Sequence, residues 1–138
     1  MWSGMNEDFA PFELAVKLKE KGFMEPCFGW YYPAEVCGFD YKTMIVFNNS
    51  AYRGSNYKDM LVSHKDEKHI DAPTIPQVLK WLRNTYNLHV ETYPCGLGMW
   101  KFLVTNITTL EERALCDKYT SSEQAEIAGI SYVLDNLI

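Results

Sequence analysis

The sequence predicts an α+β fold in which an antiparallel or mixed sheet of four to five strands packs with three helices. Apolar residues recur at helical spacing in three separate segments of the chain. Short segments rich in aromatic and β-branched residues lie between them, as expected for strands. No βαβ rhythm requires a parallel sheet, so the expected order is α-β-β-(β)-α-β-β-α.

The composition is that of one folded domain. The chain has 138 residues, of which 47% are hydrophobic and 22% are charged, so it can bury a core of its own. We expect a single domain over residues 1–138, with residues 1–10 as a loosely ordered leader. The cysteines form no CxxC pair, which favours reduced thiols: Cys27, Cys37, Cys95 and Cys116.

The expected location is cytoplasmic, without a membrane association. No apolar run approaches the roughly 20 residues that a membrane-spanning helix needs, and the N-terminus has no signal-peptide pattern. The formal net charge is −5, with most of the excess acid in residues 106–138. Because Lys and Arg supply most of the nonspecific affinity for phosphates, this balance argues against nucleic-acid binding.

The first predicted helix covers residues 11–21. Pro11 suits its first turn, apolar residues follow at helical spacing, and Gly22 suits a left-handed cap. Phe23 is then expected to fold back onto the helix. A strand rich in aromatic residues is expected over residues 27–32.

A second strand is expected over residues 41–47. One set of side chains there, Thr43, Ile45 and Phe47, alternates with another, Lys42, Met44 and Val46. The Asn, Ser and Gly content of residues 48–56 predicts a loop. Residues 57–63 are a candidate for a third, shorter strand. The polar stretch over residues 64–71 is expected to be a solvated connector.

The second half of the chain has clearer patterns. Residues 76–86 form an apolar stripe after Pro76, which predicts a helix, and residues 88–93 and 99–105 predict a hairpin around a turn at 94–98. Residues 108–119 fit either a short helical turn or an excursion of the chain. A capping box of Thr120 and Glu123 predicts the last helix, over residues 121–137.

Aromatic residues are concentrated in the segment from Phe28 to Tyr57. They suit core positions and cross-strand pairs, but exposed rings would instead anchor a protein interface or stack on bases or sugars. The acidic charge weakens the last alternative. The residues proposed for an interaction surface are Trp30, Tyr31, Tyr52 and Tyr57.

The densest polar cluster is a candidate metal or acid–base site with His64, Asp66 and His69 at its centre, accompanied by Glu67 and Asp71. Two histidines five residues apart do not share one face of a helix or a strand, so only a folded-back loop would bring them together. A solvated, charged connector is the competing interpretation. No cofactor is predicted, because the Gly96-Leu97-Gly98 segment is followed by a strand instead of a phosphate-binding helix.

The chain also resembles a group of small uncharacterised proteins encoded by bacteriophages, prophages and other mobile elements of gut anaerobic bacteria. The resemblance spans nearly the whole chain and has structural marks: a helix begun by proline with a central Trp81, a hairpin, and a final helix capped by Ser and Glu. The segments that carry it are LAVKLKEKGF, EPCFGWYY, APTIPQVLKWLRNTYNLHVE, MWKFLV and YTSSEQAEIAGISYVLDNLI. The group has no assigned activity, so the resemblance assigns no functional residue.

The leading hypothesis is a non-enzymatic protein-interaction module of phage or prophage origin, with an unidentified protein partner. Homodimerisation through an exposed sheet edge is a variant of this hypothesis. The alternative is a small metal-dependent enzyme, hydrolase-like, that uses the cluster between His64 and Asp71, with His89 as a further candidate.

Overall fold

A computed structural model describes residues 9–25, 27, 29–31, 46–47 and 70–138. The chain divides into two compact units, Met1–Thr74 and Ile75–Ile138. The prediction of one domain over the whole chain therefore stays a prediction.

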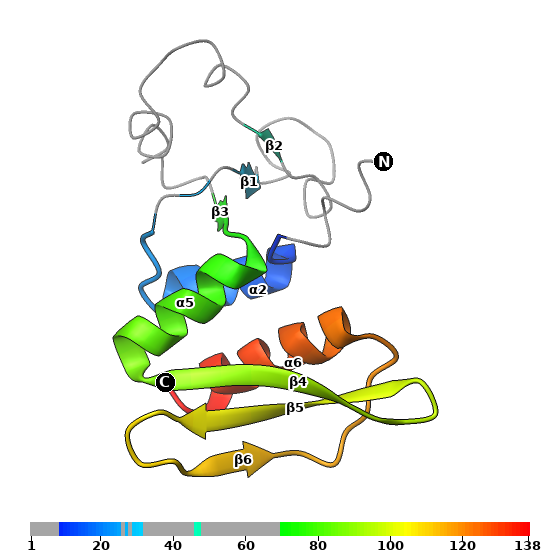
Figure 1. The fold of residues 1–138 in the computed structure, drawn as a ribbon. Helices are drawn as coiled ribbons and strands as arrows, with labels where there is room; N and C mark the ends of the chain where they lie inside the picture. The colour runs from blue at the N-terminus through cyan, green and yellow to red at the C-terminus, as the bar shows by residue number, and fades with distance from the viewer. Residues whose placement is uncertain (1–8, 26, 28, 32–45, 48–69) are drawn as a thin grey trace. The chain divides into compact units, whose positions relative to one another are not determined.

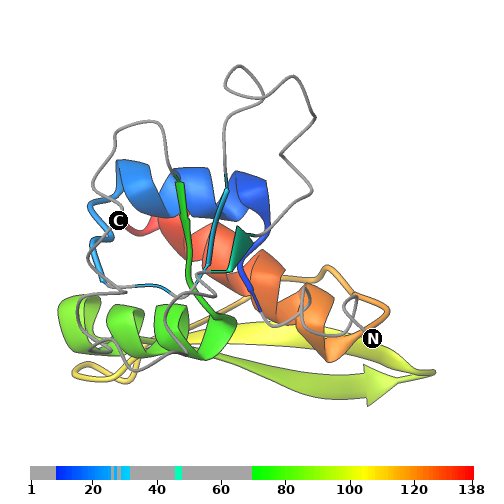
Figure 2. The same cartoon turned by 90° about the horizontal axis from the view of Figure 1, so that it is seen from above.

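The described part of the first unit contains one helix and three strands: α2 (Phe12–Glu20), β1 (Gly29–Tyr31), β2 (Val46–Phe47) and β3 (Ile70–Ala72). The second unit has the order α-β-β-β-α, with α5 (Ile75–Tyr86), β4 (Leu88–Gly96), β5 (Met99–Asn106), β6 (Glu112–Ala114) and α6 (Ser122–Asn136). Figures 1 and 2 show these elements from two directions.

Helix α2 begins and ends as its sequence predicts. The amide of Ala15 donates to the carbonyl of Pro11 at 2.8 Å, which closes the first turn. Gly22 adopts a φ of 87°, and the amide of Phe23 donates back to the carbonyl of Leu18 at 2.9 Å. Phe23 is buried, as expected for a residue that folds back onto the helix.

The small sheet of the first unit has the order β2-β1-β3, with both pairs antiparallel. Tyr31 belongs to a buried cluster with Phe9, Ala15 and Ala72. Its hydroxyl donates to the carbonyl of Ala10 at 2.7 Å, and burial raises the pKa of Tyr31 to about 12. The phenol is therefore a neutral structural donor at physiological pH.

In the second unit, β4, β5 and β6 form an antiparallel sheet with β5 in the middle. Helix α6 lies along one face of this sheet (Figure 1). The strand residues directed to that face are buried beneath the helix: Leu88, Val90, Phe102 and Val104.

Gly129 allows α6 to approach the sheet closely. A Cβ atom at this position would lie 2.7 Å from Cγ1 of Val90 and 3.1 Å from the ring of Phe102. Only a residue without a side chain fits this distance. The ring of Phe102 also packs against Tyr132, with 5.9 Å between the centroids.

The α+β class and the three helices are confirmed for the described residues. The expected sheet of four to five strands is confirmed only in part, because the described strands form two three-stranded sheets. Two strands differ from expectation. Residues 70–72 form β3 at the end of the predicted connector, and residues 112–114 form β6 in the segment without an assignment.

The cap of α6 is one residue later than predicted. Ser121, and not Thr120, accepts the backbone N–H of Gln124 at 3.1 Å. The Thr120 hydroxyl instead donates to the side-chain oxygen of Gln124 at 2.7 Å. Thr120 with Glu123 and Ser121 with Gln124 both have capping-box spacing, so the sequence alone does not distinguish the two caps.

Half-buried Glu126 in α6 predicts a pH dependence of stability. Burial, and then the charge of Glu123, raise the pKa of the Glu126 carboxyl above its usual range. Its protonation therefore favours the folded state at low pH, and this stabilisation is lost as pH rises through the raised native pKa. We expect Glu126→Gln to raise the melting temperature at pH 7, with a gain below about 1 kcal/mol since solvent screens the carboxylate.

The measurement is a pair of thermal melts, at pH 7 and below pH 4, where the gain should disappear. Glu112→Gln is the matched control, since it removes the same charge from an exposed position. An equal gain for both variants would show that net charge, and not burial of Glu126, is the cause.

None of the described helices is both long enough and apolar enough to cross a membrane.

Candidate functional site

Most residues of the predicted interaction surface and metal site lie outside the described residues. Tyr52, Tyr57, His64, Asp66 and His69 belong to this group, as do Glu67 and the side chain of Trp30. Their proposed roles stay predictions.

Tyr31 is the exception, and it corrects the expectation of an exposed ring. Only 3% of its surface is exposed, because the ring packs edge-on against Phe12, with 5.5 Å between the centroids, and the hydroxyl is bonded to Ala10. The Tyr31 side chain therefore stabilises the first unit and offers no surface to a partner.

The described residues contain no group of three or more His, Cys, Asp or Glu side chains that could hold a metal ion. Asp71, at the end of the predicted cluster, lies in β3 opposite Trp30. His89, the further candidate, lies on the sheet face away from α6, and its Nε2 is 4.0 Å from a carboxylate oxygen of Glu91. An exposed pair of this kind contributes little to stability.

Cys27 has the environment of a structural thiol. Its side chain is buried, and its Sγ donates to the carbonyl of Glu25 at 3.2 Å. Burial, and then the charges of Asp71 and Glu25, raise the pKa of the Cys27 thiol well above its usual range. Because the thiolate is the nucleophile, Cys27 is unsuited to nucleophilic catalysis.

The most exposed apolar feature of the second unit is the tip of the β4–β5 hairpin, defined here as residues 92–100. This hairpin tip carries no charge, and it extends beyond the end of α6 in both views (Figures 1 and 2). The side chain of Leu97 is 100% exposed at its end, and Tyr93 is 37% exposed. Apolar side chains held this far from a core contribute little to folding.

The backbone conformation at the hairpin tip is unfavourable for a leucine at position 97. Gly96 pairs with Met99, so Leu97 and Gly98 form a two-residue turn with φ values of 56° and 73°. Such turns strongly prefer Asn-Gly, since the left-handed conformation costs most other residues about 1–2 kcal/mol. Leu97 therefore combines backbone strain with complete exposure, and strained backbone is concentrated at functional sites.

Leu110 has the same two properties in a different setting. Its φ is 62° and its side chain is 73% exposed. Its neighbours, however, are Thr109 and the exposed acid Glu111. The hairpin tip is thus the uncharged one of the two exposed leucine sites.

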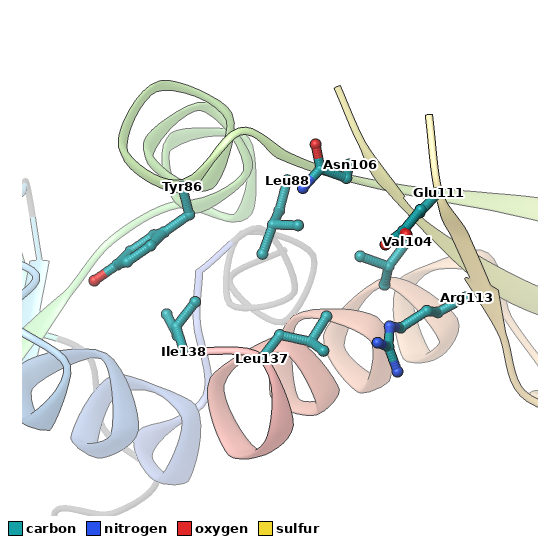
Figure 3. Close-up of a pocket in the computed structure, with 8 residues that line it drawn as sticks. All are labelled: Tyr86, Leu88, Val104, Asn106, Glu111, Arg113, Leu137 and Ile138. Carbon is teal, nitrogen blue, oxygen red and sulfur yellow. The ribbon is translucent and has the colours of Figure 1, made fainter. Parts of the chain in front are cut away.

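A pocket lies at the other end of the same sheet, beside the C-terminal end of α6 (Figure 3). Its volume is about 230 Å³, which is below the roughly 300–1,000 Å³ of sites for drug-sized ligands. The apolar residues that line it come from β4, from β5 and from the segment after α6: Leu88, Val104, Leu137 and Ile138.

The rim of this pocket is polar and carries both signs of charge, from Glu111 and Arg113. Arg113 extends from β6 toward the end of α6, where Leu137 lies (Figure 3). Asn106 uses its side-chain oxygen to accept the amides of Thr108 and Thr109, at 2.9 and 3.0 Å. Its amide nitrogen is directed to the side of the pocket where Leu88 lies (Figure 3).

Neither the hairpin tip nor the pocket was predicted as a functional site. Residues 94–98 were recognised as a turn, and a Leu between two glycines was a signal that the turn lacks its preferred residues. The pocket offered no such signal, because its lining is drawn from α5, from all three strands of the sheet and from the two residues that follow α6.

Comparison with known proteins finds no family model, no curated protein and no solved structure that matches this chain.

Proposed function

We propose that the protein is a non-enzymatic protein-interaction module that contacts its partner through the hairpin tip. The observation that carries this proposal is the complete exposure of Leu97 on a left-handed backbone. An uncharged, projecting tip fits a concave apolar site on a protein, because burial of apolar area is the main driving force of association.

Two features of the described residues support binding over catalysis. They hold no cluster of metal-ligating side chains, and their buried thiol is protonated. His89 and Glu91 form an exposed pair on the sheet face away from α6, and neither residue lines the pocket. The central residues of the metal-dependent alternative, His64, Asp66 and His69, lie outside the described residues.

The proposal predicts that stability and binding change in opposite directions at Leu97. Leu97→Asn creates the preferred Asn-Gly turn, so we expect the free energy of unfolding to rise by about 1 kcal/mol. Urea denaturation of both proteins measures this change. A tip residue retained for folding would instead give a loss of stability on substitution.

Leu110→Asn is the matched control. It also places Asn at a positive φ in an exposed position, so a similar gain in stability is expected. The two variants should differ in their binding to a protein that the wild-type chain captures from a cell lysate, because only Leu97→Asn removes the apolar end of the hairpin tip. If both variants bound that protein equally well, the assignment of the tip as the contact site would be contradicted.

The origin from a phage or prophage belongs to the same proposal. Its support is the sequence resemblance over α2, α5, the hairpin and α6. Sequencing of the DNA on both sides of the gene tests it, since phage structural or packaging genes should lie close by. Flanks made only of housekeeping genes would oppose a mobile origin.

A further inference from the structure

We propose that the pocket beside the end of α6 binds a small zwitterion, an α-amino acid with a short aliphatic side chain. In this complex Arg113 donates to the carboxylate of the ligand, and the carboxylate of Glu111 accepts from its ammonium group. This site goes beyond the proposed function, because the pocket and the hairpin tip lie at opposite ends of strand β4 and share no residue.

The size and the surface of the pocket favour a small polar ligand. Its volume of about 230 Å³ is below the roughly 300–1,000 Å³ of sites for drug-sized ligands, so its occupant has few heavy atoms. Leu88 and Val104 are buried at its floor, and most of the surface that a ligand would meet is polar. Because apolar stabilisation scales with the apolar area removed from water, hydrogen bonds and charges have to supply most of the affinity.

The rim places one positive and one negative charge on the same side of the sheet. Arg113 pairs with Val104, whose side chain is buried beneath α6, and Glu111 lies two residues before Arg113. Side chains two residues apart in an extended chain point to the same face, so both charges lie on the α6 side. Figure 3 shows the Glu111 carboxylate beside Val104 and the Arg113 guanidinium beside Leu137, so the two charged groups are directed to different walls of the pocket.

Neither charge is matched within the part of the chain that the structure describes. Glu111 and Arg113 form no ion pair there, with each other or with a third residue. A ligand with a single charge would satisfy one of the two groups and meet repulsion from the other. A zwitterion provides a charge-assisted hydrogen bond for both, so the mixed rim favours this class of ligand.

Asn106 adds a donor whose orientation is fixed by the protein. Its side-chain oxygen accepts the amides of Thr108 and Thr109, at 2.9 and 3.0 Å. Its backbone amide donates to the carbonyl of Glu111 at 2.8 Å, which holds it beside the negative end of the rim. Because the oxygen is engaged, the side-chain nitrogen is directed to the pocket (Figure 3), where it can donate to a carboxylate oxygen of the ligand.

The remaining walls suit a short aliphatic side chain. Tyr86, Leu137 and Ile138 line the pocket and are half-buried, so they keep apolar surface that a ligand can cover. A charged side chain would bring a third charge to a rim that has one of each sign. L-valine, which has a small apolar side chain, is therefore the probe.

The interaction is expected to be weak, since a small ligand makes few contacts and Glu111 and Arg113 are exposed. We expect a dissociation constant in the millimolar range. Solvent-exposed charge pairs are screened by salt, so added salt should lower the affinity.

Titration of the full chain with three probes, followed by nitrogen–proton correlation NMR, tests the proposal. L-valine carries both charged groups, isovalerate lacks the ammonium group, and isobutylamine lacks the carboxylate. L-valine should produce saturable shifts of the Asn106 side-chain amide and of the Leu137 backbone amide, while the amide of Leu97 stays unchanged. The other two probes should bind about tenfold more weakly or worse, because each leaves one rim charge without a partner.

Two variants assign the charges. Arg113→Gln should bind L-valine no better than isobutylamine, and Glu111→Gln should no longer prefer L-valine to isovalerate. A structural role of Arg113 at the end of α6 would instead lower the melting temperature and leave the preference intact. Glu112→Gln is the matched control and should bind as the wild type does, because Glu112 pairs with Thr105 and does not line the pocket.

Absence of saturable shifts up to the solubility limit of L-valine overturns the proposal. Similar binding of all three probes by the wild-type chain also overturns it, and this comparison decides the matter if a variant does not fold. None of these results bears on the hairpin tip, because the stability and binding of Leu97→Asn test the proposed function separately.

Discussion

Replacement of Phe102 by Ala is expected to lower the free energy of unfolding by about 3–5 kcal/mol, the typical cost for a buried aromatic side chain. Phe102 is 2% exposed in the middle strand of the second sheet, directly beneath α6. Its ring lies 5.9 Å from that of Tyr132 and 6.2 Å from that of Tyr119. The substitution leaves a cavity where the helix meets the sheet, and urea denaturation measures the loss.

Leu103→Ala is the control for this prediction. Leu103 is the next residue of β5, and its half-buried side chain lies on the opposite face of the sheet. Truncation there should cost about 1 kcal/mol, because part of its surface is already in contact with water. Similar losses for both variants would mean that the core is not beneath α6.

Gly129→Val is expected to destabilise the protein by about 1–3 kcal/mol, although valine has a higher helix propensity than glycine. The new side chain begins at a Cβ only 2.7 Å from Cγ1 of Val90. Val90 is β-branched and buried, so it cannot rotate away cheaply. Helix α6 has to move away from the sheet, and thermal melts should report a lower midpoint.

Ala128→Val controls for the cost of a β-branched residue in the same helix. Ala128 is only half buried, so its replacement should change stability by about 0.5 kcal/mol. If Gly129→Val raised the melting temperature instead, the close approach of α6 to the sheet would be contradicted.

Sequence patterns located the helices well because each helix has an apolar stripe and a recognisable end. Helix α5 was predicted to within one residue, from the stripe around Trp81 and Leu82. The left-handed end of α2 at Gly22 was equally clear. These signals are local, so they can be recognised in the sequence without knowledge of the tertiary structure.

The strands that were missed depend on pairing with distant segments. Strand β6 is short and exposed, with Glu112 and Arg113 in two of its positions, so it lacks any apolar alternation. It becomes a strand only because β5 offers it a hydrogen-bonding edge. Strand β3 similarly pairs with β1, and Asp71 made that segment resemble a polar connector.

The candidate site was less accessible to sequence reasoning than the fold. The hairpin was predicted, but the exposure of Leu97 depends on how far the tip extends beyond α6 (Figure 2). The pocket depends on where Leu137 meets the sheet, a tertiary property that no spacing encodes. Tyr31 shows the opposite error, since a ring proposed for the interaction surface is packed against Phe9 and Phe12.

The central claim is that the hairpin tip is a contact surface, so that Leu97 is retained at a cost to folding. Urea denaturation of the wild-type protein and of Leu97→Asn tests this most directly. We expect the variant to have a free energy of unfolding about 1 kcal/mol higher, because Leu97 lies at a positive φ with a fully exposed side chain. A lower free energy of unfolding for Leu97→Asn would contradict the account.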